Sequence, residues 1–439
     1  MTTPIELPYT KRTLANGLDV VVHEARHVPI VAVNLWYHVG SKNERPGRTG
    51  FAHLFEHLMF EGSEHHNSGY FMPLQQAGAL LNGSTNTDRT NYWEVVPTAA
   101  LELALWMESD RMGYLLPALT RERFETQRDV VLNERRQNYE NRPYGLALMA
   151  LTSALYPPDH PYHWLTIGAA DDIRAMQFED VQAFFRAYYH PGNASLALAG
   201  DIDTAQAFDL AEKYFGEIPG SAPPAPVAAT APLLAGEVRL VLEDRVELPR
   251  IYMAWHSPAM FEAGDAESDL LADLLANGKT SRLYRTLVYD ERVSLDVSAY
   301  QHSRELGSFF LLASTAAPGR SLAEIATIID LKIQGVADDG PMDAEMERGL
   351  AQAEAHFMYR LQTVGGFGGK SDQLNTYNVF RGDPNYFAAD LARYRAATPD
   401  RVRAAAREHL RFDRRVLLSV VPRGQAALAL PGSEPVSVT

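Results

Sequence analysis

The sequence predicts an α+β protein of two homologous domains, each a mostly antiparallel sheet packed with helices. Residues 218–236 are rich in Pro, Ala and Ser, a composition typical of a linker. The two flanking segments repeat a similar order of helices and strands, without the regular βαβ rhythm of a doubly wound sheet. We therefore expect an N-terminal domain at 1–217 and a homologous C-terminal domain at 237–439.

The apolar patterns of the two halves correspond in order. Near the start of each half, a strand-like apolar run at 29–36 or 249–255 precedes a long helical stretch. Near the end of each half, a helical run leads into a short apolar strand. These runs are 180–190 and 193–200 in the first half, and 401–409 and 414–421 in the second.

Composition excludes several classes of function. The chain has 439 residues, of which 46% are hydrophobic and 22% charged, so it can form more than one core. It has no cysteine, so any metal must be bound by His, Asp or Glu. A net charge of −15 argues against a nucleic-acid partner. No apolar run is long enough to span a membrane, so we expect a cytoplasmic protein, or a periplasmic one if a signal peptide was removed.

A short helix with two distinct faces is predicted between Gly50 and Gly62. His53 and His57 are four residues apart, so both imidazoles project from one side of the helix. Glu56 lies on the same side, where its carboxylate can act as general base toward a metal-activated water. The opposite face is apolar and consists of Phe51, Leu54, Phe55, Leu58 and Met59.

A catalytic zinc keeps three protein ligands and one open position, so a third ligand is required. We expect it to be Glu134, on a second helix predicted over 120–141. Gln127 precedes Glu134 by seven residues, or two helical turns, on the same face. Gln127 is therefore predicted to hydrogen-bond a ligand in support of the metal.

Three motifs together resemble the pitrilysin/insulinase metallopeptidases. The H-x-x-E-H order of His53–His57 is the inverzincin arrangement, although histidines four apart also occur on ordinary solvated helices. The other two are the stretch 82–92 (NGSTNTDRTNY) and the stretch 128–134 (RDVVLNE). The chain is most similar to the subfamily of mitochondrial processing peptidase and its bacterial relatives. The resemblance implies a zinc endopeptidase with one zinc per chain and two similar domains.

The resemblance also implies that a peptide substrate binds as an added strand on a sheet edge near the zinc. The residues that match this edge run from Asn82 to Asp88 and include Gly83, Ser84, Thr85 and Asn86. Such β-augmentation relies on main-chain hydrogen bonds. In the alternative, Asn82-Gly83 is only a turn and 84–87 an ordinary polar edge strand.

The chain departs from the family pattern in two respects. Gln127 stands where relatives usually carry glutamate, and Val288 and Leu295 align with a family Arg and Tyr that stabilise the oxyanion. Either another alignment applies, with Arg292 or Tyr289 in these roles, or the chain is half of an enzyme. In the second case a homologous partner subunit supplies the Arg and Tyr in a heterodimer, with a homodimer or monomer as alternatives.

The second half has lost the predicted metal site. Asp269, Ala272 and Asp273 align with His53, Glu56 and His57, and we interpret them as a solvated helix face.

The competing functions are a non-catalytic assembly subunit of the same family and a structural zinc site. The intact Glu56 argues against the former and the lack of a fourth ligand against the latter. The glycine-rich run 365–369 lacks the first glycine of a phosphate loop, so we predict a mobile turn near the substrate.

Overall fold

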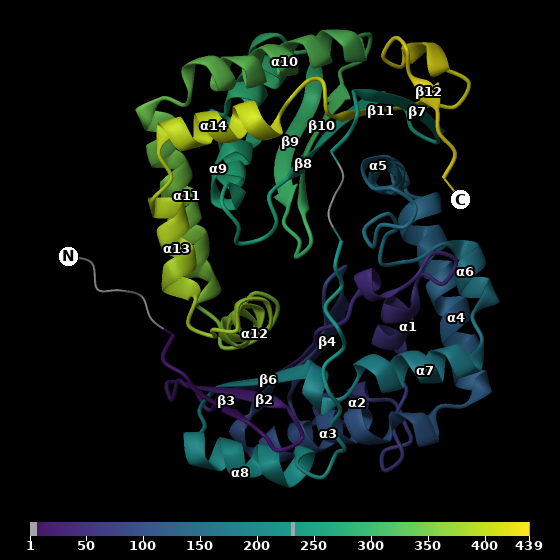
Figure 1. Ribbon diagram of the computed structural model, residues 1–439, viewed down its shortest axis with the longest axis vertical. Coiled ribbons are helices and arrows are strands. Elements are labelled where there is room, and N and C mark those ends of the chain that lie inside the picture. Colours follow the sequence, from purple (N-terminus) through teal and green to yellow (C-terminus); the bar gives the residue numbers. More distant parts are fainter. Residues whose placement is uncertain (1–6, 230–232, 439) are drawn as a thin grey trace. The chain divides into compact units, whose positions relative to one another are not determined.

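The computed structural model of the chain describes residues 7–229 and 233–438, which form two compact units (Figure 1). Described residues of the predicted linker 218–236 form neither helix nor strand, and its residues 230–232 lie outside the described part. Each unit is assembled from three stretches of sequence. The first comprises the chain up to Asn133, Leu165–Val227 and His356–Asp390, and the second Glu134–Trp164, Ala228–Ala355 and the chain from Leu391. The predicted boundaries at 217 and 237 concern the duplicated halves and stay a prediction.

The first unit contains a six-stranded sheet with the strand order β1-β2-β6-β3-β5-β4. Only β2 and β6 are parallel, and the other neighbouring strands are antiparallel. Strand β4 therefore has one free edge. The strands are β1 (Thr10–Thr13), β2 (Asp19–Glu24), β3 (Ile30–Tyr37), β4 (Leu80–Thr85), β5 (Thr90–Pro97) and β6 (Ala194–Gly200).

The second unit has a corresponding strand order, β12-β7-β11-β8-β10-β9, but its outer strand β12 is parallel to β7, whereas β1 is antiparallel to β2. The parallel pair β7 and β11 occupies the place of β2 and β6, and the edge strand β9 occupies the place of β4. The predicted fold of two similar, mostly antiparallel α+β domains is confirmed. The strands are β7 (Val238–Asp244), β8 (Arg250–Ser257), β9 (Ser294–His302), β10 (Ser308–Ala316), β11 (Val416–Pro422) and β12 (Glu434–Pro435).

Helices cover both faces of the first sheet. Figure 1 shows α3 and α8 on one face and α12 on the other. Helix α12 comes from the C-terminal half of the sequence, although its sheet comes from the N-terminal half. The helices of this unit are α1 (Phe51–Leu58), α2 (Phe71–Gln76), α3 (Leu101–Ala118), α6 (Ala170–Ala175), α7 (Phe178–Tyr188), α8 (Thr204–Phe215) and α12 (Lys370–Arg381).

The second sheet is also buried on both faces. Its larger core joins the sheet to α9, α10 and α14, with Met253, Trp255 and Leu271 at its centre. Helix α5, from the N-terminal half, closes the other face through Ala150 and Leu151. The two halves thus exchange helices, a feature absent from any local pattern. The helices are α5 (Ala147–Leu155), α9 (Asp265–Ala276), α10 (Leu322–Asp339) and α14 (Pro399–His409).

Three helices cross from one unit to the other, so the unit boundary falls within continuous secondary structure. They are α4 (Arg121–Arg135), α11 (Asp343–Arg360) and α13 (Phe387–Arg395).

The elements predicted near the ends of each half are confirmed within two residues, as α7, β6, α14 and β11. The alternative of a turn at Asn82-Gly83 is wrong, because both residues lie inside β4. The turn is at 86–89, where the Asn86 carboxamide accepts hydrogen bonds from the backbone N–H groups of Asp88 and Arg89.

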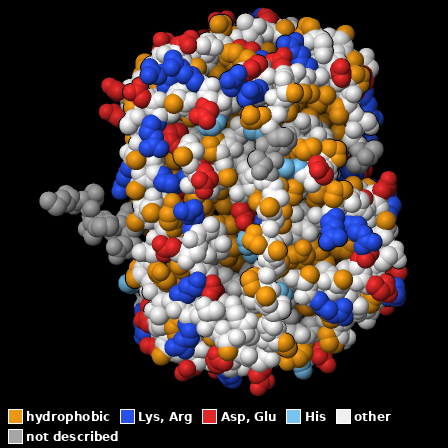
Figure 2. Space-filling model, in the orientation of Figure 1, with side chains coloured by type: hydrophobic (Ala, Val, Ile, Leu, Met, Phe, Trp, Pro, Cys, Tyr) orange, Lys and Arg blue, Asp and Glu red, His pale blue; other side chains and the backbone are white. Residues whose placement is uncertain are grey.

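Charged side chains of both signs are interspersed on the face shown in Figure 2, with apolar side chains between them. Such a mixed surface is typical of a solvated protein. Within the described part of the chain, no helix combines the length and the apolar character that crossing a bilayer requires.

Candidate metal and catalytic site

Helix α1 has the two faces that its sequence predicts. Phe51, Leu54, Phe55 and Leu58 are buried, whereas the histidines and Glu56 are half-exposed. On the apolar side, Phe184 of α7 stacks on Phe55 with 5.7 Å between ring centroids. The core face therefore fixes the helix and leaves the opposite face for chemistry.

The start of α1 is held by a buried carboxylate. Glu44 accepts hydrogen bonds from the backbone N–H groups of Gly50 and Ala52, both at 2.9 Å. An acid at this position satisfies amides that the helix leaves unpaired and complements the helix dipole. Gly50 adopts the left-handed conformation (φ 95°), and a Cβ at Gly168 would lie 2.6 Å from its Cα. The helix start is thus fixed by a cap and by close backbone packing.

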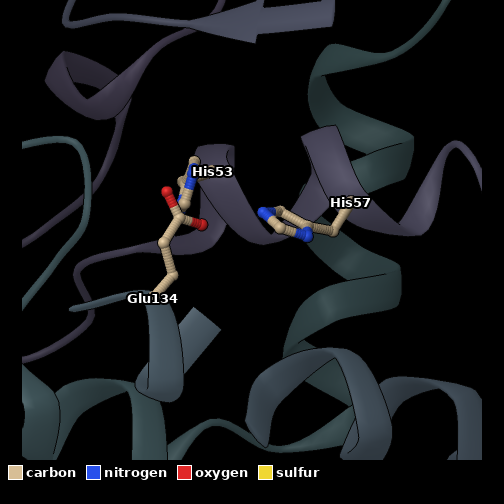
Figure 3. A group of neighbouring side chains, drawn as sticks. All are labelled: His53, His57 and Glu134. Atoms are coloured by element: carbon tan, nitrogen blue, oxygen red, sulfur yellow. The ribbon is translucent and has the colours of Figure 1, made fainter. Parts of the chain in front are cut away.

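Glu134 is brought to the two histidines by α4. It is the penultimate residue of this continuous helix, whose residues 121–133 belong to the same unit as α1. One ligand atom from each of His53, His57 and Glu134 can be chosen so that all three lie within 4.8 Å of one another. Figure 3 shows the Glu134 carboxylate beside the His53 ring, with His57 projecting from the next turn. The two imidazoles and one carboxylate are the donor set expected for a catalytic zinc.

Asn138 is a site residue that the sequence interpretation missed. Its side-chain amide donates to Glu134 Oε1 at 3.2 Å, which orients the carboxylate. The two residues are four apart in a helical stretch that continues as a π-helix over Arg136–Glu140. The i, i+4 spacing is the signal that could have identified it.

Gln127 does not make the hydrogen bond that we predicted. Its amide donates to Glu61 Oε1 at 2.7 Å, not to one of the three ligands. The reason is distance along the helix. Gln127 shares a face with Glu134 but precedes it by seven residues, which places the two roughly 10 Å apart along the axis. Gln127 therefore joins α4 to the segment that follows α1.

The surroundings of Glu56 contain two buried phenols. The hydroxyl of Tyr92 donates to the Phe55 carbonyl at 3.1 Å and ties α1 to β5. Burial raises the pKa of Tyr92 and of Tyr189, and the charge of Glu56 acts in the same direction on both. Both phenols therefore stay neutral near neutral pH.

The predicted substrate edge is strand β4. The backbone N–H of Asn86 donates to the Arg89 carbonyl at 3.0 Å, which closes the hairpin. Hydrogen-bonded and non-hydrogen-bonded pairs alternate along an antiparallel ladder, so Asn82 and Ser84 direct their main-chain groups toward β5. The main-chain groups of Leu81, Gly83 and Thr85 point to the free edge.

Gly83 is required by packing, because a Cβ there would lie 3.0–3.1 Å from the rings of Tyr92 and Phe60. Asn82 is exposed, and its carboxamide oxygen accepts from the Gly83 N–H at 2.8 Å. Ser84 instead belongs to the hairpin, since its hydroxyl donates to Asn91 Oδ1 at 2.7 Å.

Arg89 fixes this hairpin from within. Its guanidinium donates to the Ser84 carbonyl at 2.8 Å and lies 5.1 Å from the centre of the Trp36 ring. Burial lowers the pKa of Arg89, while the charges of Asp372 and Glu56 act in the opposite direction. The cation thus stiffens the end of the predicted edge.

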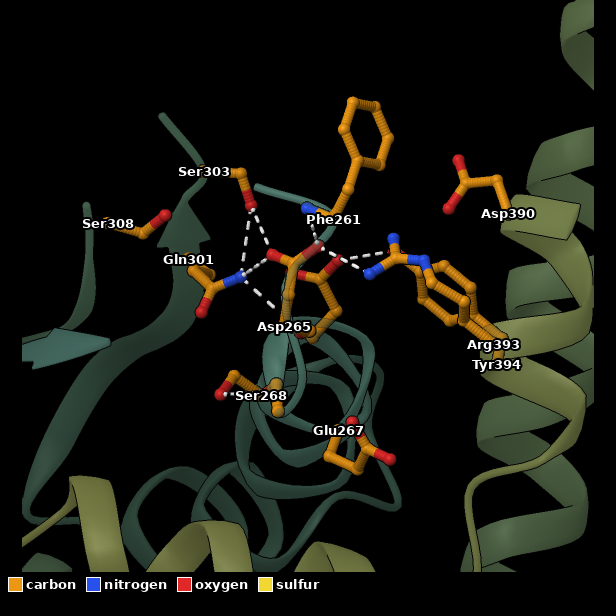
Figure 4. Close-up of polar contacts among 12 residues, drawn as sticks. Phe261, Asp265, Glu267, Ser268, Gln301, Ser303, Ser308, Asp390, Arg393 and Tyr394 are labelled. Atoms are coloured by element: carbon orange, nitrogen blue, oxygen red, sulfur yellow. Dashed lines mark hydrogen bonds and ion pairs between the residues drawn. The ribbon is translucent and has the colours of Figure 1, made fainter. Parts of the chain in front are cut away.

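The counterpart of α1 in the second unit is α9, where buried acids replace ligands. Figure 4 shows Asp265 surrounded by donors from three segments. Arg393 donates to it at 3.0 Å, and the other donors are Phe261 N, Gln301 Nε2 and Ser303 Oγ. This carboxylate is therefore committed to structural contacts.

Asp269 and Asp273 match His53 and His57 in being half-exposed and four apart on their helix. Asp269 accepts from the Tyr394 hydroxyl at 2.6 Å, and Asp273 from Asn277 at 2.9 Å. Burial, aided by the charge of Asp265, raises the pKa of Asp269 to about 7. The predicted solvated face is thus partly buried and hydrogen-bonded.

The positions aligned with the family Arg and Tyr carry apolar side chains in the second unit. Val288 packs against the larger core, and Leu295 is exposed on β9. Of the alternative donors, Tyr289 is exposed and Arg292 has a left-handed backbone (φ 52°).

Family models match most of the chain in two stretches. Residues 19–160 match "Insulinase (Peptidase family M16)", and residues 175–353 match "Peptidase M16 inactive domain". The chain belongs to the pitrilysin/insulinase family. Its M16 relatives include a zinc protease, PqqE of Helicobacter pylori, which is 29% identical over 381 residues that cover 85% of each chain.

A second M16 relative is the β subunit of mitochondrial-processing peptidase from Lentinula edodes. It is 26% identical over 267 residues, which cover 58% of this chain and 56% of that one. Among solved structures, a protease from Helicobacter pylori superposes with a TM-score of 0.89 at 25% identity, over 95% of this chain and all of the other.

Proposed function

We propose that the chain is a zinc endopeptidase that hydrolyses peptides or unfolded segments. The observation that carries the proposal is the convergence of His53, His57 and Glu134, with Glu56 on the same face of α1. The donor set has the composition of a catalytic zinc site with an open position. A zinc ion held by these residues would supply Lewis acidity and an acidified water.

The roles of the chain's own groups follow from their placement. Glu56 accepts a proton from the attacking water at its carboxylate and transfers it to the nitrogen of the leaving amine. Asn138 holds the Glu134 carboxylate in orientation. The outward main-chain groups of Leu81 and Thr85, together with the Gly83 carbonyl, bind a peptide as an added strand. The Gly83 N–H joins them only when it exchanges its hydrogen bond to Asn82 Oδ1 for one to the peptide.

The test is hydrolysis of unstructured peptides by the purified chain in three states. The zinc-loaded chain is expected to cleave them, the chelated chain to be inactive, and zinc to restore cleavage. Activity that persists at full strength after removal of all metal would contradict the proposal.

We further propose that this chain is the metal-bearing subunit of a two-chain peptidase. Val288 and Leu295 cannot donate side-chain hydrogen bonds, and loss of one oxyanion donor lowers rates by roughly 100- to 1,000-fold. A homologous subunit that retains the Arg and Tyr would restore them. Adding such a chain is expected to raise turnover by that factor, whereas efficient turnover by this chain alone favours a monomer or homodimer.

A further inference from the structure

The glycine-rich loop, residues 363–370, is held in one conformation on the first sheet. The backbone N–H groups of Lys370 and Ser371 donate to the carbonyls of Thr363 and Val364, both at 3.0 Å. Gly366 and Gly368 have left-handed backbones (φ 82° and 74°). The loop is therefore a hydrogen-bonded turn, and its mobility stays a prediction.

The loop is attached to the sheet at two points. A Cβ on Gly365 would lie 2.5 Å from Ala32 Cβ and 2.7 Å from Val95 Cγ2, so only glycine permits this approach. Asp372, buried at the start of α12, accepts from the Gly368 N–H at 2.8 Å. Its other oxygen accepts from three side chains of β3 and β5, namely Trp36 at 3.0 Å, Asn91 at 3.2 Å and Asn34 at 3.3 Å.

This construction presents an aromatic ring to solvent. Phe367, at the tip of the loop, is 51% exposed, and its ring lies edge-on to Trp93 of β5 with 5.4 Å between centroids. Leu80 of the edge strand is 70% exposed. Single exposed apolar side chains are common. Here, however, Leu80 of β4 and Trp93 of β5 lie on the same face of the sheet, and Phe367 packs edge-on against Trp93; we term these three residues the edge patch.

The strand register relates the edge patch to a bound peptide. Leu80 is opposite Val95 and Asn82 is opposite Trp93, so these side chains lie on the same face as Trp93. Side chains alternate along a strand, so a peptide added beside β4 places every second side chain on this face. A large side chain can reach both the opposite and the diagonal neighbours on the adjacent strand, so one that lies beside Asn82 also reaches Leu80.

We propose that the edge patch is a specificity subsite for an aromatic or large aliphatic side chain of the peptide substrate. This inference rests on the peptide-binding edge of the proposed function. A peptide is the occupant that the geometry favours, because the patch is continuous with the free edge of β4. Its rigid attachment through Gly365 and Asp372 presents the ring with little loss of conformational freedom on binding.

The test is peptide binding to the zinc-loaded Glu56→Gln chain, which removes the general base and so separates binding from turnover. The probes are labelled ten-residue peptides of Ser, Ala and Lys with a single Phe moved along the sequence, and the readout is fluorescence anisotropy. Phe is expected to strengthen binding at alternate positions. Phe367→Ala should weaken the binding of these Phe-containing peptides about threefold to tenfold and leave the affinity for the Phe-free peptide unchanged.

Matched variants guard against an indirect effect. Leu80→Ser should cause the same selective loss and Phe367→Leu should retain most of the affinity, whereas Leu331→Ala, at a 65% exposed position of α10, should change nothing. The subsite proposal is overturned if Phe367→Ala weakens the binding of both kinds of peptide equally or of neither. It is also overturned if the chain binds no peptide. If the wild-type and Phe367→Ala chains hydrolyse the Phe-containing peptides at the same rate, the subsite alone is overturned. Phe-selective binding without any hydrolysis by the wild-type chain overturns the peptidase proposal alone.

Discussion

Helices α1 and α9 occupy corresponding places in two units with the same strand order, yet they differ in chemistry. The half-exposed residues of α1 are His53, Glu56 and His57, and its two histidines converge with Glu134. Those of α9 are Asp269 and Asp273, which accept hydrogen bonds from protein donors. Corresponding helices thus carry either a set of candidate metal ligands or a structural polar cluster, according to their side chains.

The comparison is tested most strongly by replacing the candidate metal ligands and, separately, the two acids of α9. His57→Ala and Glu134→Ala are expected to lower bound zinc from about one equivalent per chain to near zero, because two remaining ligands bind weakly. Asp269→Asn and Asp273→Asn should keep full zinc. Metal analysis of the purified variants is the measurement. Loss of zinc in the α9 variants would show that α9 takes part in metal binding and would contradict the comparison.

Glu56→Gln should separate chemistry from metal binding. The amide cannot accept the proton of the attacking water, so hydrolysis is expected to fall roughly 100- to 10,000-fold with zinc and folding retained. Steady-state assays on unstructured peptides, with zinc content measured on the same samples, provide the test. Asp273→Asn is the control and should hydrolyse normally. Near-normal turnover by zinc-loaded Glu56→Gln would remove Glu56 from its role.

The buried acid of α9 should make stability depend on pH. The folded state raises the pKa of Asp269 to about 7, from an ordinary value near 3.8, so the folded state binds its proton more tightly than the unfolded state does. The contribution of protonated Asp269 to the free energy of unfolding is therefore greatest below about pH 4, and it is lost as the pH rises through about 7. Asp269→Asn should reduce that loss, so its melting temperature should exceed that of the wild-type chain at pH 8 but not at pH 4. Equal pH profiles of the two proteins would contradict the raised pKa.

The smallest expected effect concerns the cap of α1. Glu44→Gln keeps one acceptor oxygen but removes the charge, and we expect a loss of about 1–2 kcal/mol in the free energy of unfolding. Denaturant titration measures it. Glu125→Gln, at an exposed position of α4, is the control and should change stability by less than about 0.5 kcal/mol. An equal loss in both variants would show that the cap contributes nothing specific.

The sequence predicted the features that depend on local spacing. The two faces of α1 follow from a helical period, and the strand and helix pairs at the end of each half follow from apolar runs. Features set by contacts between distant residues were missed or misplaced. Glu44 caps a helix that begins seven residues later, and Gln127 bonds Glu61 because distance along the helix, not shared face, decides its partner.

The exchange of α5 and α12 between the two halves of the sequence also depends on contacts between distant residues. Burial of a second sheet face requires a helix, but no local pattern specifies which sheet that helix covers. The identity of the covering helix depends on the whole arrangement, which periodicity within a segment does not encode.

The exchange of α12 also has a consequence for how the chain is made. The unit that carries His53 and His57 is not complete until residues 370–381 have left the ribosome, because α12 covers one face of its sheet and Asp372 bonds Asn34, Trp36 and Asn91. A nascent chain that stops after the first half leaves this face open to water. Completion of the unit that carries the two histidines is thereby delayed until translation is nearly finished, and prematurely terminated products are expected to be readily degraded.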